Sequence, residues 1–340
     1  MDIEERISLI KKKPTEEILT EELLRQKLET GEKLKHYIGF EISGRVHLGT
    51  GLMTAMKIKD FQKAGIETNI LFADYHSMLN NKLGGDLETI RKVALGYFKS
   101  AFDSLGLENV NFILASDIYD KDYWEKVLRI AEKTTLKRML RCISIMGREE
   151  TEGMDSATIF YPAMQAADIF KLDIDIAHAG MDQRKVHALA IELADRLKYK
   201  KPIAIHTHIL GSLTGPGRMG EFSKMSKSKP ETCIFIHDSE EEIKKKMKDA
   251  FCPERQVEDN PVIEMAEYLL FERFPLAIER PEKFGGNVTF NSPEELKQTF
   301  SDGKLHPMDA KNAVAQELIK MLAPAREFFA KHKELLEMVP

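Results

Sequence analysis

Short apolar runs alternate with longer amphipathic stretches along the first two-thirds of this 340-residue chain. Strands separated by helices of about 10–20 residues are typical of parallel βαβ units. The pattern therefore predicts an α/β fold built on a parallel sheet. The predicted strands are 36–40, 68–73, 111–115, 172–177 and 201–210, and the predicted helices are 51–64, 86–105, 121–148 and 182–197.

The segments on either side of this pattern have a different character. Residues 1–30 have the apolar spacing of two amphipathic helices broken at Pro14, with the second helix beginning at Thr15. Residues 211–228 read as a loop rich in glycine, serine and lysine, and from about residue 231 the chain becomes mostly helical. The expected domains are therefore 1–30, 31–230 and 231–340.

Bulk composition excludes several classes of protein. The net charge is only −5, so the chain as a whole does not indicate a nucleic-acid partner, although local patches can bind one. Three cysteines without CxxC spacing argue against a zinc site or a disulfide framework. The N-terminus lacks the apolar region of a signal peptide, and no apolar run approaches the length of a membrane helix. We therefore expect a cytoplasmic protein without membrane contact.

A glycine-rich turn, YIGFEISGRVHLGTG (37–51), joins the first predicted strand of the sheet to the following helix. Backbone N–H groups at a helix N-terminus bind anions, and Gly44 and Gly49 let the chain approach a ligand closely. His47 lies between them and can donate to a phosphate oxygen. Many such turns serve only the fold, so this motif alone does not identify a site.

A second motif, KMSKS (224–228), lies in the loop after the last predicted strand. Two lysines three residues apart can neutralise a triphosphate, and a loop can close over it as charge develops. A charge run of this kind would be unremarkable by itself. Together with the HxG turn after the first strand, it predicts a site for nucleotide phosphates.

HLGT (47–50) and KMSKS resemble the two signatures of class I aminoacyl-tRNA synthetases. Further segments are similar to tyrosyl-tRNA synthetases of the archaeal and eukaryotic type. These segments are YIGFEISG (37–44), LFADYHSMLN (71–80), TTLKR (134–138), YPAMQAADI (161–169), GMDQRKVH (180–187), RPEKFGGN (280–287) and LHPMDAKNAV (305–314). The resemblance implies a Rossmann-type catalytic domain at 31–230, an inserted helical connective segment near 117–160, and a helical anticodon-binding domain at 231–340.

The resemblance also implies a reaction. Tyrosine–tRNA ligases activate L-tyrosine with ATP to tyrosyl-adenylate and transfer the tyrosyl group to tRNA(Tyr). No covalent enzyme intermediate is expected, so catalysis is mainly positioning and charge stabilisation. The implied partners are ATP with Mg²⁺, L-tyrosine, tRNA(Tyr) and a second copy of the chain in a homodimer, with no tightly bound organic cofactor and no structural zinc.

By resemblance, Tyr161, Gln165 and Gln183 hold the α-amino group of tyrosine, while Tyr37 and Asp168 reach its phenolic hydroxyl. Tyr161, Gln165 and Asp168 lie at i, i+4 and i+7, so they share one helix face. Without the resemblance, such a polar triple could also be a satisfied buried network. A buried carboxyl that needs a hydroxyl partner rejects phenylalanine, a behaviour for which tyrosyl-tRNA synthetases are the standard example.

The resemblance makes His47, Thr50, Lys224 and Lys227 catalytic. His47 would stabilise the transferring phosphates, and the two lysines would hold pyrophosphate. Thr50 stands where the family commonly has a second histidine; threonine is a good helix N-cap, and its hydroxyl can still donate. The implied ATP-binding residues are Gly39, His47, Gly49, Met225, Ser226 and Lys227.

For tRNA, the resemblance assigns Arg138 and Arg184 to the acceptor end, and His306 and Asp309 to the first anticodon base. The alternative for the last two is an ordinary helix start. The expected aromatic stacking partner is Phe271 or Phe274.

The predicted helix 121–148 is rich in basic residues. Lys133, Lys137 and Arg141 recur every four residues and are expected on one face. That face is either simply solvated or a phosphate-binding stripe.

Other functions remain open at this point. A tryptophan-specific enzyme of the same fold is disfavoured by Asp168, because an apolar or small residue would suit an indole better. A non-catalytic RNA-binding paralogue is disfavoured by the intact His47 and KMSKS lysines. A generic nucleotidyltransferase is disfavoured by the anticodon-like C-terminal segment. His76, after the second strand, either lines the pocket or has a structural role.

Overall fold

The computed structural model describes residues 1–146, 155–217, 221–227 and 229–340. Arg148 of the predicted basic helix, Ser228 of KMSKS and part of the connective segment 117–160 lie outside these ranges. The chain divides by packing into two compact units. The first unit consists of 1–43, 57–100 and 107–208, and the second of 44–56, 101–106 and 209–340. The division after residue 208 precedes the boundary expected near 230.

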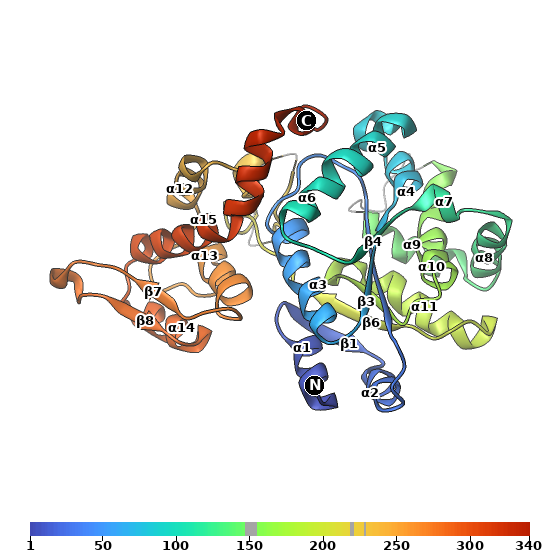
Figure 1. The fold of residues 1–340 in the computed structure, drawn as a ribbon, viewed down its shortest axis with the longest axis horizontal. Helices are drawn as coiled ribbons and strands as arrows, with labels where there is room; N and C mark the ends of the chain where they lie inside the picture. The colour runs from blue at the N-terminus through green and yellow to red at the C-terminus, as the bar shows by residue number, and fades with distance from the viewer. Residues whose placement is uncertain (147–154, 218–220, 228) are drawn as a thin grey trace. The chain divides into compact units, whose positions relative to one another are not determined.

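The first unit is built on a six-stranded sheet (Figure 1). Its strands are β1 (Thr15–Leu19), β2 (Lys35–Phe40), β3 (Glu67–Phe72), β4 (Val110–Leu114), β5 (Ile176–Gly180) and β6 (Ile203–Thr207). The order is β1-β6-β5-β2-β3-β4; β1 is antiparallel to β6, and all other pairs are parallel. The predicted parallel α/β sheet is confirmed.

Helices separate these strands along the chain. They are α1 (Ile3–Lys11), α2 (Glu21–Glu29), α3 (Thr54–Lys63), α4 (Asp74–Leu79), α5 (Leu87–Val93), α6 (Lys99–Ser104), α7 (Ala115–Ile118), α8 (Lys121–Glu132), α9 (Leu136–Cys142), α10 (Tyr161–Lys171) and α11 (Arg184–Leu197). π-Helical turns at Gly49–Met53 and Ala94–Phe98 continue into α3 and α6.

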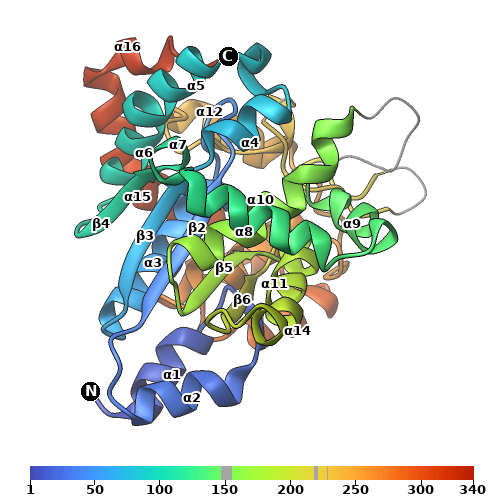
Figure 2. The same cartoon turned by 90° about the vertical axis from the view of Figure 1, so that its right-hand side faces the viewer.

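Two apolar clusters cover opposite faces of the sheet. Ala177 of β5 packs in a cluster that includes residues of α8, α10 and α11, which lie side by side in Figure 2. Its neighbour Ile176 packs in the other cluster, with α1, α2 and Phe61. Successive strand residues point to opposite faces, so this division follows from strand geometry.

The N-terminal segment differs from the prediction of two helices. α1 forms as expected, but Thr15–Leu19 is strand β1, and the second helix begins only at Glu21. Thr20, in the left-handed conformation with φ 60°, separates the two elements. The prediction of a helix from Thr15 was wrong because pairing with β6, distant in sequence, decides the conformation of this segment.

The predicted helix 121–148 is interrupted. α8 ends at Glu132, and α9 begins after Thr135, whose side chain accepts the N–H of Arg138 as an N-cap. Lys133 is the C-cap of α8 and therefore does not continue the face that Lys137 and Arg141 share in α9. The prediction that Lys133 shares one helix face with Lys137 and Arg141 was therefore wrong.

The predicted strand 172–177 begins too early. The N–H of Leu172 donates to Asp168 O at 3.0 Å and ends α10, and Asp173 then turns with φ 49°. β5 starts only at Ile176. The apolar–acidic alternation that suggested a strand therefore spans a helix end and a turn.

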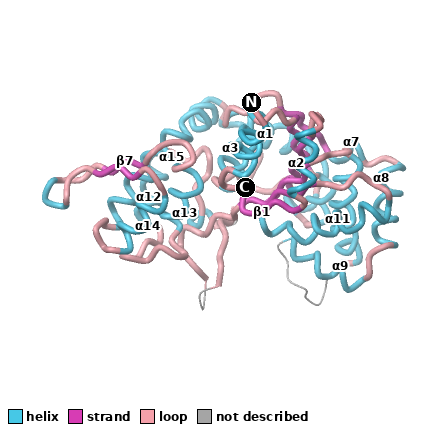
Figure 3. Tube along the Cα trace, turned by 90° about the horizontal axis from the view of Figure 1, so that it is seen from below, coloured by secondary structure: helices cyan, strands magenta, loops and turns pink. Residues whose placement is uncertain are grey.

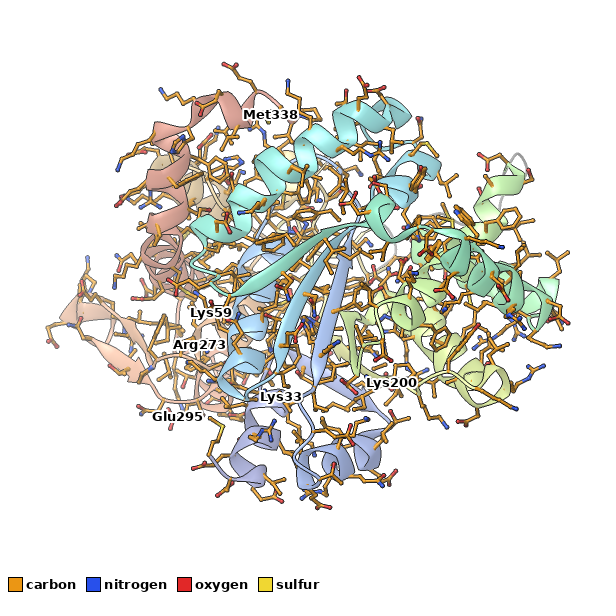
Figure 4. The ribbon with its side chains drawn as sticks, turned by 45° about the vertical axis from the view of Figure 1, so that its right-hand side comes forward. Lys33, Lys59, Lys200, Arg273, Glu295 and Met338 are labelled. Atoms are coloured by element: carbon orange, nitrogen blue, oxygen red, sulfur yellow. The ribbon has the colours of Figure 1, made fainter. Side chains whose placement is uncertain are left out.

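The buried Asp175 ties the start of this strand to its neighbours. Its Oδ2 accepts the N–H of Lys35 at 2.9 Å, and Oδ1 lies 3.2 Å from Lys27 Nζ and 3.0 Å from Lys200 Nζ. Of these residues, Lys200 is labelled in Figure 4. Burial alone would raise the pKa of Asp175, but these donors bring it below its usual value. The carboxylate therefore links three parts of the chain: α2, the first residue of β2 and the segment that precedes β6.

The second unit is mostly helical after residue 231, as predicted. Its later helices are α12 (Glu240–Asp249), α13 (Pro261–Met265), α14 (Pro293–Ser301), α15 (Pro307–Lys331) and α16 (Lys333–Leu336). Ser239 and Glu242 form a capping box at the start of α12. A small antiparallel hairpin of β7 (Leu276–Ile278, labelled in Figure 3) and β8 (Val288–Phe290) was not foreseen.

Across the described ranges, no helix has both the length and the apolar character that a bilayer span requires.

A buried lysine fastens α1 to α3. Lys57 is fully buried, and its ammonium donates to the carbonyls of Leu9, Ile10 and Lys12 at 2.9, 2.6 and 2.8 Å. These carbonyls lie at the end of α1, where intrahelical donors are missing. The N-terminal helix is therefore bound to the helix that follows the HLGT turn.

We predict that Lys57→Ala lowers the free energy of unfolding by about 3 kcal/mol, because three carbonyls lose a charged donor and the buried side chain leaves a cavity. Lys63→Ala, an exposed position at the end of the same helix, should change it by less than about 0.5 kcal/mol. Denaturant unfolding of both variants measures the difference, and equal effects would refute this role for Lys57.

Candidate active site

A buried carboxyl in α10 is the centre of the first group of site residues. Asp168 is 1% exposed, and its Oδ1 accepts a hydrogen bond from Tyr119 Oη at 2.8 Å. The ring of Tyr119 stacks on that of Tyr123 at 3.7 Å. Burial raises the pKa of Asp168 well above its usual value, although the hydrogen bond from Tyr119 acts in the opposite direction. The hydroxyl of Tyr123 donates instead to Met164 O at 3.1 Å. A protonated carboxyl both donates and accepts, so it can pair with a further hydroxyl.

Tyr37 of β2 lies in the same cluster. It is buried, and its pKa is raised well above its usual value, first by burial and then by the negative charge of Asp168. The structure therefore brings together Tyr37 and Asp168, the two residues expected at a phenolic hydroxyl.

His76 of α4 joins this cluster as well. Its Nδ1 lies 3.2 Å from Tyr119 Oη, and its ring meets Tyr161 edge-on at 4.5 Å. Burial lowers the pKa of His76 to about 4, so the ring is neutral near pH 7. Its Nε2 lies 3.9 Å from Asp168 Oδ2 and has no hydrogen-bond partner among the described residues. Buried polar atoms usually have a hydrogen-bond partner, so this unpaired nitrogen favours a role for His76 in contacting a ligand over a role in capping the strand.

The remaining polar residues of α10 form two pairs. Tyr161 Oη donates to Glu41 Oε1 at 2.7 Å. Gln165 Nε2 donates to Gln183 Oε1 at 3.1 Å, and Gln183 Nε2 donates to Ile145 O at 2.9 Å. Amide oxygens, a phenol and a carboxylate are suitable acceptors for an ammonium group.

Sequence reasoning missed three members of this group. Glu41 lies within the segment YIGFEISG but was not singled out. Tyr119, the C-cap of α7, and Tyr123, in the first turn of α8, are four residues apart and lie outside every segment that carried the resemblance. An aromatic pair at that spacing was the available signal.

The second group, in the second unit, contains both signatures. The N–H of Gly49 donates to His47 Nδ1 at 3.2 Å. Burial, and then the charges of Lys227 and Lys224, lower the pKa of His47 to about 3. A neutral imidazole that accepts at Nδ1 carries its proton on Nε2. His47 is therefore a neutral N–H donor beside two lysines.

Thr50 does not cap a helix, contrary to the expectation. It lies inside the π-helical turn that begins at Gly49. Its Oγ1 lies 3.3 Å from His47 N, a donor, and 3.5 Å from His47 O, an acceptor. The hydroxyl thus contacts the backbone of His47, because the turn starts one residue before Thr50.

The KMSKS segment lies close to the glycine-rich turn. Gly44 has φ +30°, and a Cβ on it would lie 3.4 Å from Lys227 Cβ. The backbones of Lys224 and Gly211 form an isolated antiparallel β-bridge. Met225 is buried, and the N–H of Ser226 donates to Thr232 Oγ1 at 3.1 Å. The two signatures, far apart in sequence, are therefore neighbours.

The residues expected to bind tRNA lie in both units. In the first unit, Arg138 Nη2 donates to Glu192 Oε1 at 2.8 Å, and Arg184 pairs with an acidic residue of β1. In the second unit, His306 caps α15 by accepting the N–H of Met308 at 3.1 Å, and Asp309 lies in its first turn. The helix-start interpretation of HPMD is therefore correct for its local geometry. Phe271 and Phe274 are both half-buried.

Comparisons with known proteins identify the family of the chain. The family model for "tRNA synthetases class I (W and Y)" matches residues 29–323. A tyrosine–tRNA ligase from Thermococcus kodakarensis is 54% identical, over all of this chain and 98% of that protein. The crystal structure of a tyrosyl-tRNA synthetase from Pyrococcus horikoshii, complexed with L-tyrosine, is 51% identical with a TM-score of 0.95, covering 100% and 99% of the chains. A tyrosyl-tRNA synthetase from Aeropyrum pernix is 43% identical with a TM-score of 0.88 over the same shares.

The raised pKa of Asp168 has a consequence for stability. Because its folded-state pKa lies above the unfolded value of about 3.9, stability is lost as the pH rises from that value through the folded pKa. We therefore predict that Asp168→Asn raises Tm, and by more at pH 8 than at pH 4.

Asp117→Asn, an exposed carboxylate in α7, is the matched control and should not change Tm at either pH. Thermal unfolding at both pH values measures the effect. A lower Tm for Asp168→Asn at pH 8 would show that the ionised carboxylate stabilises the fold.

Proposed function

Because the chain belongs to the class I tRNA synthetases of the tryptophan and tyrosine group, we propose that it is a tyrosine–tRNA ligase. It activates L-tyrosine with ATP to tyrosyl-adenylate, releasing pyrophosphate. It then transfers the tyrosyl group to the 3′ end of tRNA(Tyr). These substrates meet during translation, so we expect the enzyme to act in the cytoplasm.

The buried cluster around Asp168 is the reason to propose tyrosine as the amino-acid substrate. Asp168, Tyr37 and the open Nε2 of His76 offer polar partners to one phenolic hydroxyl. Phenylalanine would leave these groups unpaired, and an indole has no hydroxyl for them. Tyrosine is therefore favoured over phenylalanine and tryptophan.

The α-amino group of tyrosine is assigned to Tyr161, Gln165 and Gln183, beside Glu41. Their phenol and amide oxygens accept from an ammonium, and the carboxylate of Glu41 adds a negative charge. The pairs that these residues form with one another support their placement as one recognition group.

The nucleotide is assigned to the signature residues. His47 donates from Nε2 to a phosphate oxygen as negative charge moves to the leaving pyrophosphate, and Lys224 and Lys227 neutralise it. Thr50 supports the backbone of His47, so its role is positioning. The residues assigned to ATP contact are Gly39, His47, Gly49, Met225, Ser226 and Lys227.

Mg²⁺ fits this site as part of the nucleotide complex. The signature residues that face the phosphates are cationic or neutral donors, so the phosphate oxygens themselves would bind the ion. When bound, Mg²⁺ neutralises phosphate charge. The protein contributes the lysines and the imidazole N–H.

For tRNA, we assign Arg138 and Arg184 to the acceptor end, and His306 and Asp309 to the first anticodon base. A carboxylate can accept from the donors of guanine, which makes Asp309 suitable for discriminating that base. These assignments make 31–230, with its connective segment near 117–160, the catalytic domain and 231–340 the anticodon-binding domain.

A homodimer is proposed on the basis of the connective segment. Trp124 and Leu128 lie one turn apart on α8 and are 42% and 62% exposed. Large apolar side chains placed together on a surface favour a protein partner.

The first experiment is ATP–pyrophosphate exchange with tyrosine, tryptophan and phenylalanine. Wild-type enzyme should exchange with tyrosine alone. Asp168→Asn should weaken selectivity for tyrosine over phenylalanine by at least about tenfold, since one hydrogen-bonding partner changes. Asp117→Asn, at an exposed position of α7, serves as the control. Exchange with tryptophan alone, or with no amino acid, would overturn the proposal.

The homodimer is tested by sedimentation. Wild-type protein should sediment at twice the chain mass of 38.8 kDa. A variant carrying Trp124→Glu and Leu128→Glu should sediment as a monomer, because the charges would be buried in the interface. Leu95→Glu, at another exposed apolar position, should remain dimeric. A monomeric wild type would contradict the proposal.

A further inference from the structure

Arg184 is held by a residue from the N-terminal segment. Its Nε lies 2.7 Å from Glu17 Oε2 and 3.0 Å from Oε1, and its Nη2 lies 2.9 Å from Oε1. Such a side-on bidentate pair fixes the plane of the guanidinium as well as its position. Glu17 is the only acidic partner of Arg184 within the described chain.

Glu17 is in turn fixed by the sheet. It lies in β1 opposite His206 of β6, and His206 Nδ1 lies 3.0 Å from Glu17 Oε2. His206 Nε2 lies 3.1 Å from Nδ1 of the buried His187, which is one turn after Arg184 in α11. Burial lowers the pKa of both imidazoles, so both are neutral near pH 7.

The proton positions in this chain follow from the acceptor at its end. A carboxylate accepts only, so a neutral His206 donates from Nδ1 and accepts at Nε2. His187 then donates from Nδ1. The hydrogen bonds all run toward Glu17, which keeps its carboxylate oriented toward Arg184.

The other edge of the guanidinium remains available. Arg184 is exposed, with 47% of its side chain accessible, and its Nη1 contacts no acceptor in the described residues. Nη1 and the outer N–H of Nη2 form a second donor edge, which suits a phosphate.

Gln183, the preceding residue, is held independently. Its amide contacts Gln165 and the carbonyl of Ile145, not Glu17. A change in the orientation of Arg184 therefore leaves the contacts of Gln183 in place. The tRNA step should respond to such a change more strongly than amino-acid activation.

We propose that Glu17 is a positioning residue for tRNA charging, which orients the free guanidinium edge of Arg184 toward a phosphate of the tRNA acceptor end. The inference rests on the proposed function, which assigns Arg184 to that end. It gives the N-terminal segment a part in the reaction, although Glu17 touches no reacting atom.

The test compares Glu17→Ala with Glu16→Ala in steady-state charging of tRNA(Tyr). Glu16 is the adjacent acidic residue of β1, and its carboxylate pairs with His208 Nδ1 at 3.1 Å. Glu17→Ala should raise KM for tRNA about five- to tenfold, with a smaller change in kcat, because an unrestrained guanidinium binds less well. Glu16→Ala removes the same charge and should leave KM unchanged within about twofold.

Two further variants separate positioning from folding. Glu17→Gln keeps one acceptor oxygen for Arg184 and should give an intermediate KM. In an Arg184→Ala background, adding Glu17→Ala should change KM by less than about twofold, since the partner is already absent. Thermal unfolding of each variant identifies any loss of fold.

The outcomes distinguish this inference from the proposed function. Tyrosine-dependent ATP–pyrophosphate exchange, measured in the same preparations, tests activation of the amino acid. If exchange occurs but Glu17→Ala leaves KM unchanged or lowers it, Glu17 does not position Arg184; a lower KM would mean that it competes with RNA. A full effect of Glu17→Ala in the Arg184→Ala background would also overturn the inference. Absence of exchange in the wild type would instead overturn the proposed function.

Discussion

The site for the amino acid depends on burying one carboxyl group. Asp168 lies in α10, and the groups around it come from four other elements or connections: Tyr37 from β2, His76 from α4, Tyr119 from the connection between α7 and α8, and Tyr123 from the first turn of α8. Burying a carboxyl is unfavourable unless other groups satisfy it, and the single hydrogen bond from Tyr119 does so only in part. The buried carboxyl of Asp168 lowers the stability of the fold, and it provides a polar group that can recognise a hydroxyl.

The general fold could be predicted because it rests on local pattern. Apolar periodicity identified β2, β3, β4 and β6, and the parallel sheet followed from their spacing. The predictions of secondary structure failed where a partner distant in sequence, or a single residue, determines the local conformation. β1 is a strand because β6 pairs with it, Thr135 restarts a helix, and the turn at Asp173 delays β5. None of these leaves a clear periodic signal.

The same contrast holds for the site. The triple of α10 was predictable because i, i+4 and i+7 share a face, and resemblance supplied the signatures. Glu41 and Tyr119 were missed because their contacts to α10 join residues 120 and 49 positions apart. The tautomer of His47 was also beyond sequence, since it depends on the direction of one backbone N–H, that of Gly49. Chemistry at this level of detail requires coordinates.

β1 also affects whether the sheet of one chain can pair with strands of another chain. It covers one edge of the sheet, where β6 carries the buried apolar residues Ile203 and Ile205. An uncovered β6 would present free backbone N–H and C=O groups, a template on which strands of other chains can add. β1 carries two consecutive glutamates, and charge at an edge discourages such pairing. The short strand that holds Arg184 therefore also protects this edge of the sheet from pairing with the strands of other chains.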